Sequence, residues 1–483
     1  MKNLILTVLL MLNANVSFAQ SSGTINVPIT PGSTIVGATK GDYTGESFIS
    51  VGDVNGDGFP DFLVNARNSP ISAVYGYTYL IYGQPNVLPT SINISAFWYP
   101  NNPVPGVIIA GDLRSASGQS IAAAGDVNRD GFKDILLSYF DMYSENSART
   151  YLLYGGRNLP SIIKLSDVGS TVPGASFIGV RPNALASGDI NGDGYPDILI
   201  GDYSSKTAFL IYGKAELTGQ ISINATTSVS LTLDNLNGSV KVTTLDINKD
   251  GYTDILLTSN KNVYIIFGKA ENLTSMAVTD SFLNGVNGVK LTSWFADVTD
   301  PIGDINSDGY PDIAVRGDTN YNWIYKTVIV FGKAAWAPAM DLGSRISNGE
   351  LNGSNGFTLL GLGRPAVVGG PSSAPAGDYN SDGKTDAIFG DFFYNNIGPG
   401  NGAGRAVILF GKTVWPAEYS LITNIIDGTE SMQFVGTGYF GNSVGYLDNA
   451  FGGDGCGINV GYLIGAPGYG LNIGKAYIVN LTK

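Results

Sequence analysis

Two residue types that carry much of enzyme and metal chemistry are almost missing from this sequence. It contains no histidine and a single cysteine, Cys456. The lack of histidine excludes Ser-His-Asp and Cys-His catalytic arrangements, His-ligated zinc and a histidine general base. A single cysteine cannot form a disulfide within the chain. If the protein leaves the cytoplasm, it therefore needs another stabilising device.

Charged residues are also scarce, and acidic residues outnumber basic ones. Only 14% of the residues are charged, and the net charge is −13. Nucleic-acid binding needs a basic face, so we expect no nucleic-acid partner. No long amphipathic helix is evident, whereas 65 glycines and 26 tyrosines favour many short strands and tight turns.

The N-terminus has the features of a secretory signal. Lys2 precedes a short apolar run, Leu4–Leu12, and Ser17-Phe-Ala19 is a small-x-small cleavage site. The apolar run is too short to span a bilayer, and no later run offers a transmembrane segment. We therefore expect residues 1–19 to be a signal peptide, and residues 20–483 to be secreted to the cell surface, the medium or the periplasm. Residues Thr24–Ile29 are expected to form a strand that closes the fold.

One phrase, Asp-x-Asn-x-Asp-Gly-x-x-Asp, recurs six times and is each time followed by a short apolar run. With the first Asp as position i, the carboxylate and amide oxygens at i, i+2, i+4 and i+8 and the carbonyl at i+6 can surround one ion if the chain turns at the Gly of i+5. Several hard oxygen ligands suit Ca²⁺. The pattern predicts about six calcium sites, with these ligands: Asp53, Asn55, Asp57, Phe59 and Asp61; Asp126, Asn128, Asp130, Phe132 and Asp134; Asp189, Asn191, Asp193, Tyr195 and Asp197; Asp246, Asn248, Asp250, Tyr252 and Asp254; Asp304, Asn306, Asp308, Tyr310 and Asp312; Asp378, Asn380, Asp382, Lys384 and Asp386.

Two other interpretations of this phrase are weaker. An EF-hand needs Glu at i+11, where all six copies have an apolar residue, and it needs flanking helices. A plain Asp/Asn/Gly turn would explain one copy. It does not explain why three carboxylates that repel each other are present every time. Six bound Ca²⁺ ions would offset most of the net negative charge.

A second phrase follows each loop and occurs seven times. It is aromatic and β-branched and mostly ends in Gly, as in Tyr77–Gly83, Arg149–Gly155 and Asn262–Gly268, so it predicts a strand and a turn. Further short strands are expected at segments such as Ser91–Ser95, Gly106–Ala110 and Gln220–Asn224. Four short strands per unit, with 57 to 74 residues between loop starts, predict an all-β, seven-bladed propeller of four-stranded blades. In the seventh unit, the loop of Asp448–Cys456 has lost the spacing, and we expect no tight site there.

These residues make the chain resemble the FG-GAP repeats of the integrin α-subunit head, a seven-bladed β-propeller with calcium loops of this form. The resemblance covers nearly all of residues 20–483, although only the seventh unit shows Phe440-Gly441 together with Gly465-Ala-Pro467. The resemblance implies metal loops on one face of the propeller and partner-binding loops on the opposite face. The leg domains and membrane helix of an integrin have no counterpart in this sequence.

The expected function is a secreted, calcium-binding adhesion or interaction module for a protein or glycan ligand, acting as a monomer and not as an enzyme. Aromatic side chains such as Trp98, Tyr99 and Trp323 could stack on a sugar ring. The alternative is a polysaccharide lyase or carboxylate-dependent hydrolase that uses the propeller channel. It would need a pair of acidic residues outside the metal loops, and the candidates are Asp202, Glu350 and Asp391. A purely structural surface component is a third interpretation.

Overall fold

The computed structural model describes residues 24–26, 32–66, 76–85, 88–99, 102, 104–111, 117–141, 144–234, 239–318, 325–344, 347–363, 372–395, 403–421, 428–437, 439–448, 459–467 and 473–482. The expected signal peptide and residues 449–456 of the altered seventh loop lie outside the described residues. So does Trp323.

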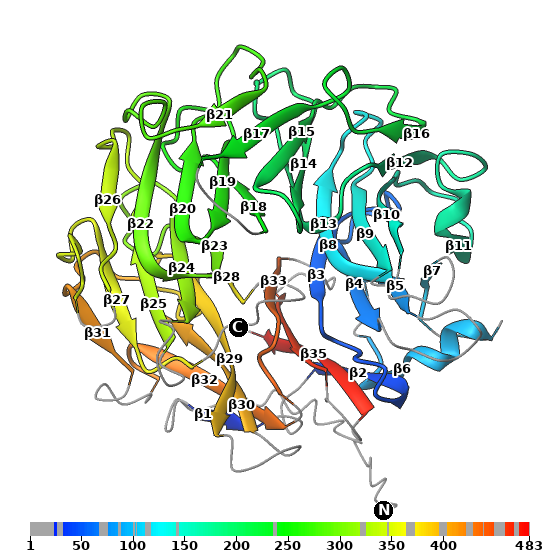
Figure 1. Cartoon of the computed structure of the whole chain (residues 1–483). Helices are drawn as coiled ribbons and strands as arrows, with labels where there is room; N and C mark the ends of the chain where they lie inside the picture. The colour runs from blue at the N-terminus through cyan, green and yellow to red at the C-terminus, as the bar shows by residue number, and fades with distance from the viewer. Residues whose placement is uncertain are drawn as a thin grey trace, which may run out of the picture.

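Seven sheets follow one another around a ring and form the blades of a β-propeller (Figure 1). The first strand of each blade, as listed below, is the innermost one, since the first strands of neighbouring blades contact each other around the ring. The first four strands of each blade are antiparallel and are, in order: β3 (Phe48–Gly52), β4 (Asp61–Ala66), β5 (Tyr77–Ile81) and β7 (Gly106–Ala110); β8 (Ser117–Gly125), β9 (Asp134–Asp141), β10 (Ser144–Leu153) and β12 (Gly174–Ile178); β13 (Pro182–Gly188), β14 (Asp197–Asp202), β15 (Thr207–Ile211) and β17 (Val229–Leu233); β18 (Lys241–Leu245), β19 (Asp254–Ser259), β20 (Lys261–Ile266) and β22 (Gly288–Ala296); β23 (Val298–Gly303), β24 (Asp312–Asp318), β25 (Tyr325–Val330) and β27 (Gly356–Leu360); β28 (Ser373–Gly377), β29 (Asp386–Asn395), β30 (Ala403–Leu409) and β32 (Ser431–Thr437); β33 (Val444–Asp448), β34 (Asn459–Ala466), β35 (Ile473–Thr482) and β2 (Gly32–Lys40).

The seven-bladed fold is confirmed, and every blade also has a short fifth strand. This strand pairs in parallel with the fourth and comes from a different part of the chain. The fifth strands of blades one to seven are β11 (Ile162–Lys164), β16 (Gly219–Ser222), β21 (Met276–Val278), β26 (Ala339–Asp341), β31 (Glu418–Ser420), β1 (Thr24–Asn26) and β6 (Ser91–Asn93). Short 3₁₀ helices, η1 (Ile94–Trp98) and η2 (Leu165–Asp167), follow β6 and β11.

The expected strands at Ser91–Ser95 and Gln220–Asn224 are therefore present but belong to a different blade from the one predicted. Strand β6 pairs with β2 of blade seven, and β16 pairs with β12 of blade two. Each blade thus receives its outer edge from the next blade along the ring. An unpaired strand edge is open to the addition of further strands. In each blade the short fifth strand covers the edge of the fourth strand.

The predicted closing strand at Thr24–Ile29 is wrong. The ring is closed by β2, which lies beside β35 as the fourth strand of blade seven. Residues Thr24–Asn26 form β1, the fifth strand of blade six, in parallel with β32. The N-terminal segment therefore reaches two neighbouring blades, and β2 joins the start of the chain to its end.

The core consists of seven clusters of buried apolar side chains, and each cluster lies between two neighbouring blades. The cluster around Ile35, Phe48 and Leu463 joins blades seven and one, and the cluster around Ile49, Val51 and Ile135 joins blades one and two. The other five join the remaining pairs in the same way. No blade buries its faces alone, so the stability of each depends on both neighbours.

Candidate metal loops

The six Asp-rich loops occupy the same place in blades one to six. Each joins the innermost strand to the second strand, as the loop between β3 and β4 does. The Asp of i+8 is the first residue of the second strand in every case. The prediction that each loop leads into a buried strand is confirmed.

Loop one shows how the polar side chains fold the backbone. Oδ1 of Asp53 accepts the amide of Asp57 at 3.1 Å, and Oδ2 accepts the amide of Gly58 at 2.8 Å. Asn55 Oδ1 accepts the Asp57 amide at 2.8 Å, and Asp57 Oδ1 accepts the Phe59 amide at 2.9 Å. The same four bonds recur in the other five loops. The six loops therefore share one backbone fold.

Two residues of each loop have a left-handed backbone. One is the predicted Gly of i+5, for example Gly58 with φ of 91°. The other is the residue at i+3, which sequence reasoning missed. It is Gly in loops one and three, but Arg129, Lys249, Ser307 and Ser381 adopt φ between 57° and 60° in the other four. These residue types give no signal of a left-handed conformation, so only the repeat register could have identified the position.

The Asp at i+8 has a structural role of its own. In loop one, Oδ2 of Asp61 accepts the Val54 amide at 2.8 Å, and Oδ1 accepts the Gly83 amide at 2.9 Å. Each of the other five loops has the equivalent pair of bonds. All six carboxylates are fully buried. They fasten the start of the loop to the end of the third strand.

The glycine that ends the aromatic phrase, such as Gly83, donates the second amide that the Asp at i+8 accepts. A Cβ on Gly83 would lie 2.5 Å from the carbonyl oxygen of Pro60, and one on Gly268 would lie 2.4 Å from that of Thr253. No side chain fits there. The recurring Gly is explained by this close approach, a reason that the sequence pattern alone did not supply.

The buried carboxyl at i+8 is costly to ionise. Burial raises its pKa to about 7 in Asp61, Asp134, Asp197 and Asp254, to about 8 in Asp312 and to about 6 in Asp386, and the carboxylates at i and i+4 add to the rise. Each loop therefore gathers three carboxyl groups close enough to repel each other. A cation in the loop would offset that repulsion.

The donor set fits calcium in its chemistry. The side-chain ligands expected at i, i+2, i+4 and i+8 all offer oxygen, and a carboxylate oxygen that accepts one amide keeps further acceptor capacity. In the structure the carboxylates at i and i+4 are turned onto amides of their own loop. Among the described residues no group of three or more Asp, Glu, Cys or His side chains is arranged to hold a metal ion. Calcium binding therefore stays a prediction.

The three acidic residues of the enzyme alternative lie in different blades. Asp391 is held by Arg405, whose Nε donates to Oδ2 at 3.0 Å, and both side chains are buried. Oδ1 of Asp202 accepts the Ser204 amide at 3.1 Å. Glu350 lies in the connection between β25 and β27 of blade five. Two of the three carboxylates are thus engaged in structural contacts.

The aromatic candidates differ in exposure. Tyr99 is 68% exposed, which suits a contact with a ligand. Trp98 instead packs on the core between blades seven and one, with its ring 5.2 Å from that of Tyr77. Of the two candidates in the described part of the chain, Tyr99 is the more exposed.

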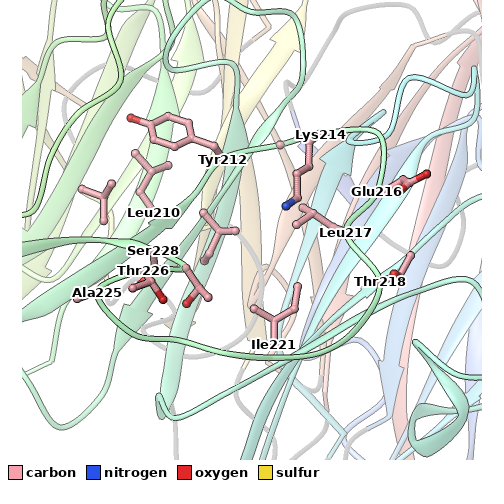
Figure 2. Close-up of a pocket in the computed structure, with 14 residues that line it drawn as sticks. Leu210, Tyr212, Lys214, Glu216, Leu217, Thr218, Ile221, Ala225, Thr226 and Ser228 are labelled. Carbon is pink, nitrogen blue, oxygen red and sulfur yellow. The ribbon is translucent and has the colours of Figure 1, made fainter.

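A pocket of about 550 Å³ lies against blade three (Figure 2) and is lined by the end of β15, the connection from Tyr212 to Ser228 and the start of β17. Its apolar lining includes Leu210, Leu217 and Ile221. The hydroxyl of Thr226 donates to Asn224 Oδ1 at 2.7 Å, and that of Thr227 donates to the Ser222 carbonyl at 2.6 Å. These hydroxyls already serve their own loop, so we assign the pocket no role.

The sequence of the chain matches known repeats and relatives. The profile of the FG-GAP repeat matches residues 47–82, and that of the FG-GAP-like repeat matches residues 189–257. Integrin alpha-3 of Cricetulus griseus is 32% identical over 185 residues, which are 36% of this chain and 15% of that protein. Integrin alpha-IIb of Homo sapiens is 28% identical over 222 residues, or 42% of this chain and 18% of that protein. The chain thus spans less than a fifth of the length of these relatives.

Two solved structures have a related shape at low sequence identity. An Agrocybe aegerita lectin that recognises non-reducing terminal N-acetylglucosamine is 12% identical with a TM-score of 0.36, covering 81% of this chain and 85% of its own. A rhamnogalacturonan lyase is 11% identical with a TM-score of 0.35, covering 72% and 55%. Such values carry no argument about activity.

Seven blades in a ring, with one repeated Asp-rich loop in six of them, define a β-propeller built around a repeated Asp-rich loop. With the matches above, the chain is a β-propeller that is similar to integrin α-subunits and has two segments that match FG-GAP repeats. In the described part of the chain, no helix has the length and apolar character that crossing a membrane requires.

Proposed function

We propose that the chain is an extracellular, calcium-stabilised interaction module that binds a protein or glycan partner at the end of the blades opposite the Asp-rich loops. The observation that carries the proposal is the repetition of one loop geometry in six blades, each loop with a buried carboxylate at i+8 and two more nearby. Asp at i, i+4 and i+8, Asn at i+2 and the carbonyl of i+6 would hold the ion. The ion would supply the positive charge that the loop lacks.

The order of strands supports the proposed position of the partner surface. Because consecutive strands of a blade are antiparallel, the connections between second and third strands lie at the end opposite the Asp-rich loops. They differ widely in length. Only Asn260 separates β19 from β20, whereas residues 67–76 separate β4 from β5, and residues 396–402 separate β29 from β30. Variable loops on a fixed scaffold are the usual place for recognition.

The relatives support an interaction role over catalysis. They are integrin α-subunits, and the segments that match the FG-GAP profiles contain loops one, three and four. The enzyme alternative has the buried Asp391–Arg405 pair against it, since that pair uses one of its three carboxylates. An extracellular location belongs to the proposal and agrees with the expected signal peptide. A monomeric state also belongs to the proposal.

Thermal unfolding with calcium and with EDTA tests the calcium part of the proposal. A ligand that binds only the folded state stabilises it by mass action. With six such sites we expect the melting temperature to fall by roughly 10 °C or more in EDTA and to recover when Ca²⁺ is added back. Equal melting temperatures would show that the loops are plain turns. Binding to glycan and protein arrays, with and without EDTA, then tests the interaction role.

A further inference from the structure

Position i+6 distinguishes loop six from the other five. Loops one to five carry an aromatic residue there, namely Phe59, Phe132, Tyr195, Tyr252 and Tyr310. Loop six carries Lys384. Since i+6 is expected to offer only its backbone carbonyl to an ion, the sequence pattern leaves its side chain unassigned.

The Lys384 side chain turns back onto its own loop. Its Nζ lies 3.0 Å from Oδ2 of Asp382, the carboxylate at i+4, while its backbone amide donates to Oδ1 of the same residue at 3.0 Å. The two side chains are only 28% and 34% exposed. One residue thus contacts both oxygens of an expected calcium ligand.

In the other five loops the same carboxylate oxygen faces a neutral group. Oδ2 of Asp57 accepts Nδ2 of Asn55 at 2.8 Å, and the bonds of loops two to five are 2.8 to 2.9 Å long. A neutral amide leaves the charge of the loop unchanged. An ammonium group at this distance removes one negative charge and would repel an arriving divalent cation.

Two other basic side chains approach neighbouring loops in a different way. Nε of Arg129 donates to the carbonyl of Gly194 in loop three, and Nζ of Lys249 donates to that of Gly309 in loop five, both at 2.7 Å. Both groups meet a backbone carbonyl at i+5, which is not an expected ligand. Among these basic groups, Lys384 is the one that contacts a ligand oxygen.

We infer that Lys384 is a built-in counter-ion of loop six, so that the loop from Asp378 to Asp386 binds a divalent cation more weakly than the other five loops. This rests on the proposed function and makes the six sites unequal. The pair is partly exposed, so the lysine can swing into solvent and the site is weakened, not lost. The expected effect is a roughly tenfold lower affinity, set by repulsion that solvent screens.

Native mass spectrometry of the whole chain during a calcium titration tests this inference. We expect five ions to bind in a first range of calcium concentration and the sixth to need about ten times more. Lys384→Met removes the ammonium group and keeps the length of the side chain, so all six ions should then bind in the first range. Lys290→Met is the matched control, because it removes a lysine that pairs with the exposed Asp280, outside the loops. It should leave the titration unchanged.

The reciprocal change is Tyr310→Lys, which places the same ammonium group in loop five. It should move one further ion into the weak range and leave four in the first. If wild type binds six equal ions and Lys384→Met changes nothing, the inference is wrong while calcium binding stands. If neither wild type nor Lys384→Met binds calcium, the proposed function fails as well.

Discussion

At the scale of single residues, the three carboxylates of a loop have different roles. Asp197 is buried and accepts the amides of Ile190 and Gly213 at 2.9 Å, so it holds two segments of backbone together. Asp193 is exposed and accepts the Tyr195 amide at 2.8 Å. The first carboxylate is needed by the fold, whereas we expect the second to serve mainly as an ion ligand.

Substitution of these two residues should separate stability from calcium binding. In EDTA, Asp193→Asn should unfold within about 0.5 kcal/mol of wild type, because it changes an exposed side chain. Asp197→Asn should cost about 1–3 kcal/mol in EDTA, because an amide group cannot accept both backbone donors. In calcium, Asp193→Asn should lose one bound ion. Chemical denaturation with and without EDTA measures all these effects, and equal losses for both variants in EDTA would contradict the assignment of roles.

The residue types at i, i+2, i+4, i+5 and i+8 could be predicted to share one loop because they repeat in register. The left-handed backbone of Arg129 and Lys249 could not, since neither residue type favours it. The contact between Asp61 and Gly83 was also hidden, because it joins two phrases that are far apart along the chain. Periodicity shows what repeats, but it does not show which repeats touch.

At the scale of strands, the N-terminal segment shows the limit of what sequence periodicity predicts. The aromatic phrases were predicted as strands, and all seven lie in the third strands of the blades. The closing strand was placed at Thr24–Ile29, yet β2 closes the ring, and β1 lies on blade six. Strand β2 is the fourth strand of a blade whose first three strands are at the far end of the chain. Ring closure therefore cannot be read from local pattern.

Two truncations should show the difference between β1 and β2. A chain that begins at residue 30 loses β1, a three-residue outer strand, and should melt within a few degrees of the mature protein. A chain that begins at residue 41 also loses β2 and with it Ile35, which is fully buried between blades seven and one. Loss of one such side chain alone costs about 2–5 kcal/mol, and the open edges of β35 and β6 add to the cost.

The second truncation should therefore be insoluble or unfolded by circular dichroism, whereas the first should keep a cooperative transition. A folded, monomeric chain beginning at residue 41 would show that β2 is dispensable. That result would contradict closure of the ring by the N-terminal strand.

At the scale of the whole molecule, the two ends of the propeller are built differently. One end carries six Asp-rich loops of the same length and fold, with polar groups that bond to their own backbone, and beside them the connections that supply all fifth strands except β1. The other carries connections that range from a single residue, Asn260, to the ten residues 67–76. Uniform loops suit a structural ion at each blade, and unequal connections suit recognition of a particular partner.

The assignment of the two ends can be tested by one exchange at each end. Replacing residues 396–402 with a Gly/Ser segment of equal length should weaken binding to a partner found by array screening at least about tenfold, since binding energy is concentrated in a few contact residues. Calcium stoichiometry and melting temperature should not change, because the Asp-rich loop of the same blade lies at the other end of β29. Val286→Ser is the control at the end of the Asp-rich loops. Its side chain is 80% exposed in the connection that leads to β22, and it should leave partner binding intact. If the control abolished binding in a folded, calcium-loaded protein while the Gly/Ser exchange had no effect, the recognition surface would have to be placed on the face of the Asp-rich loops.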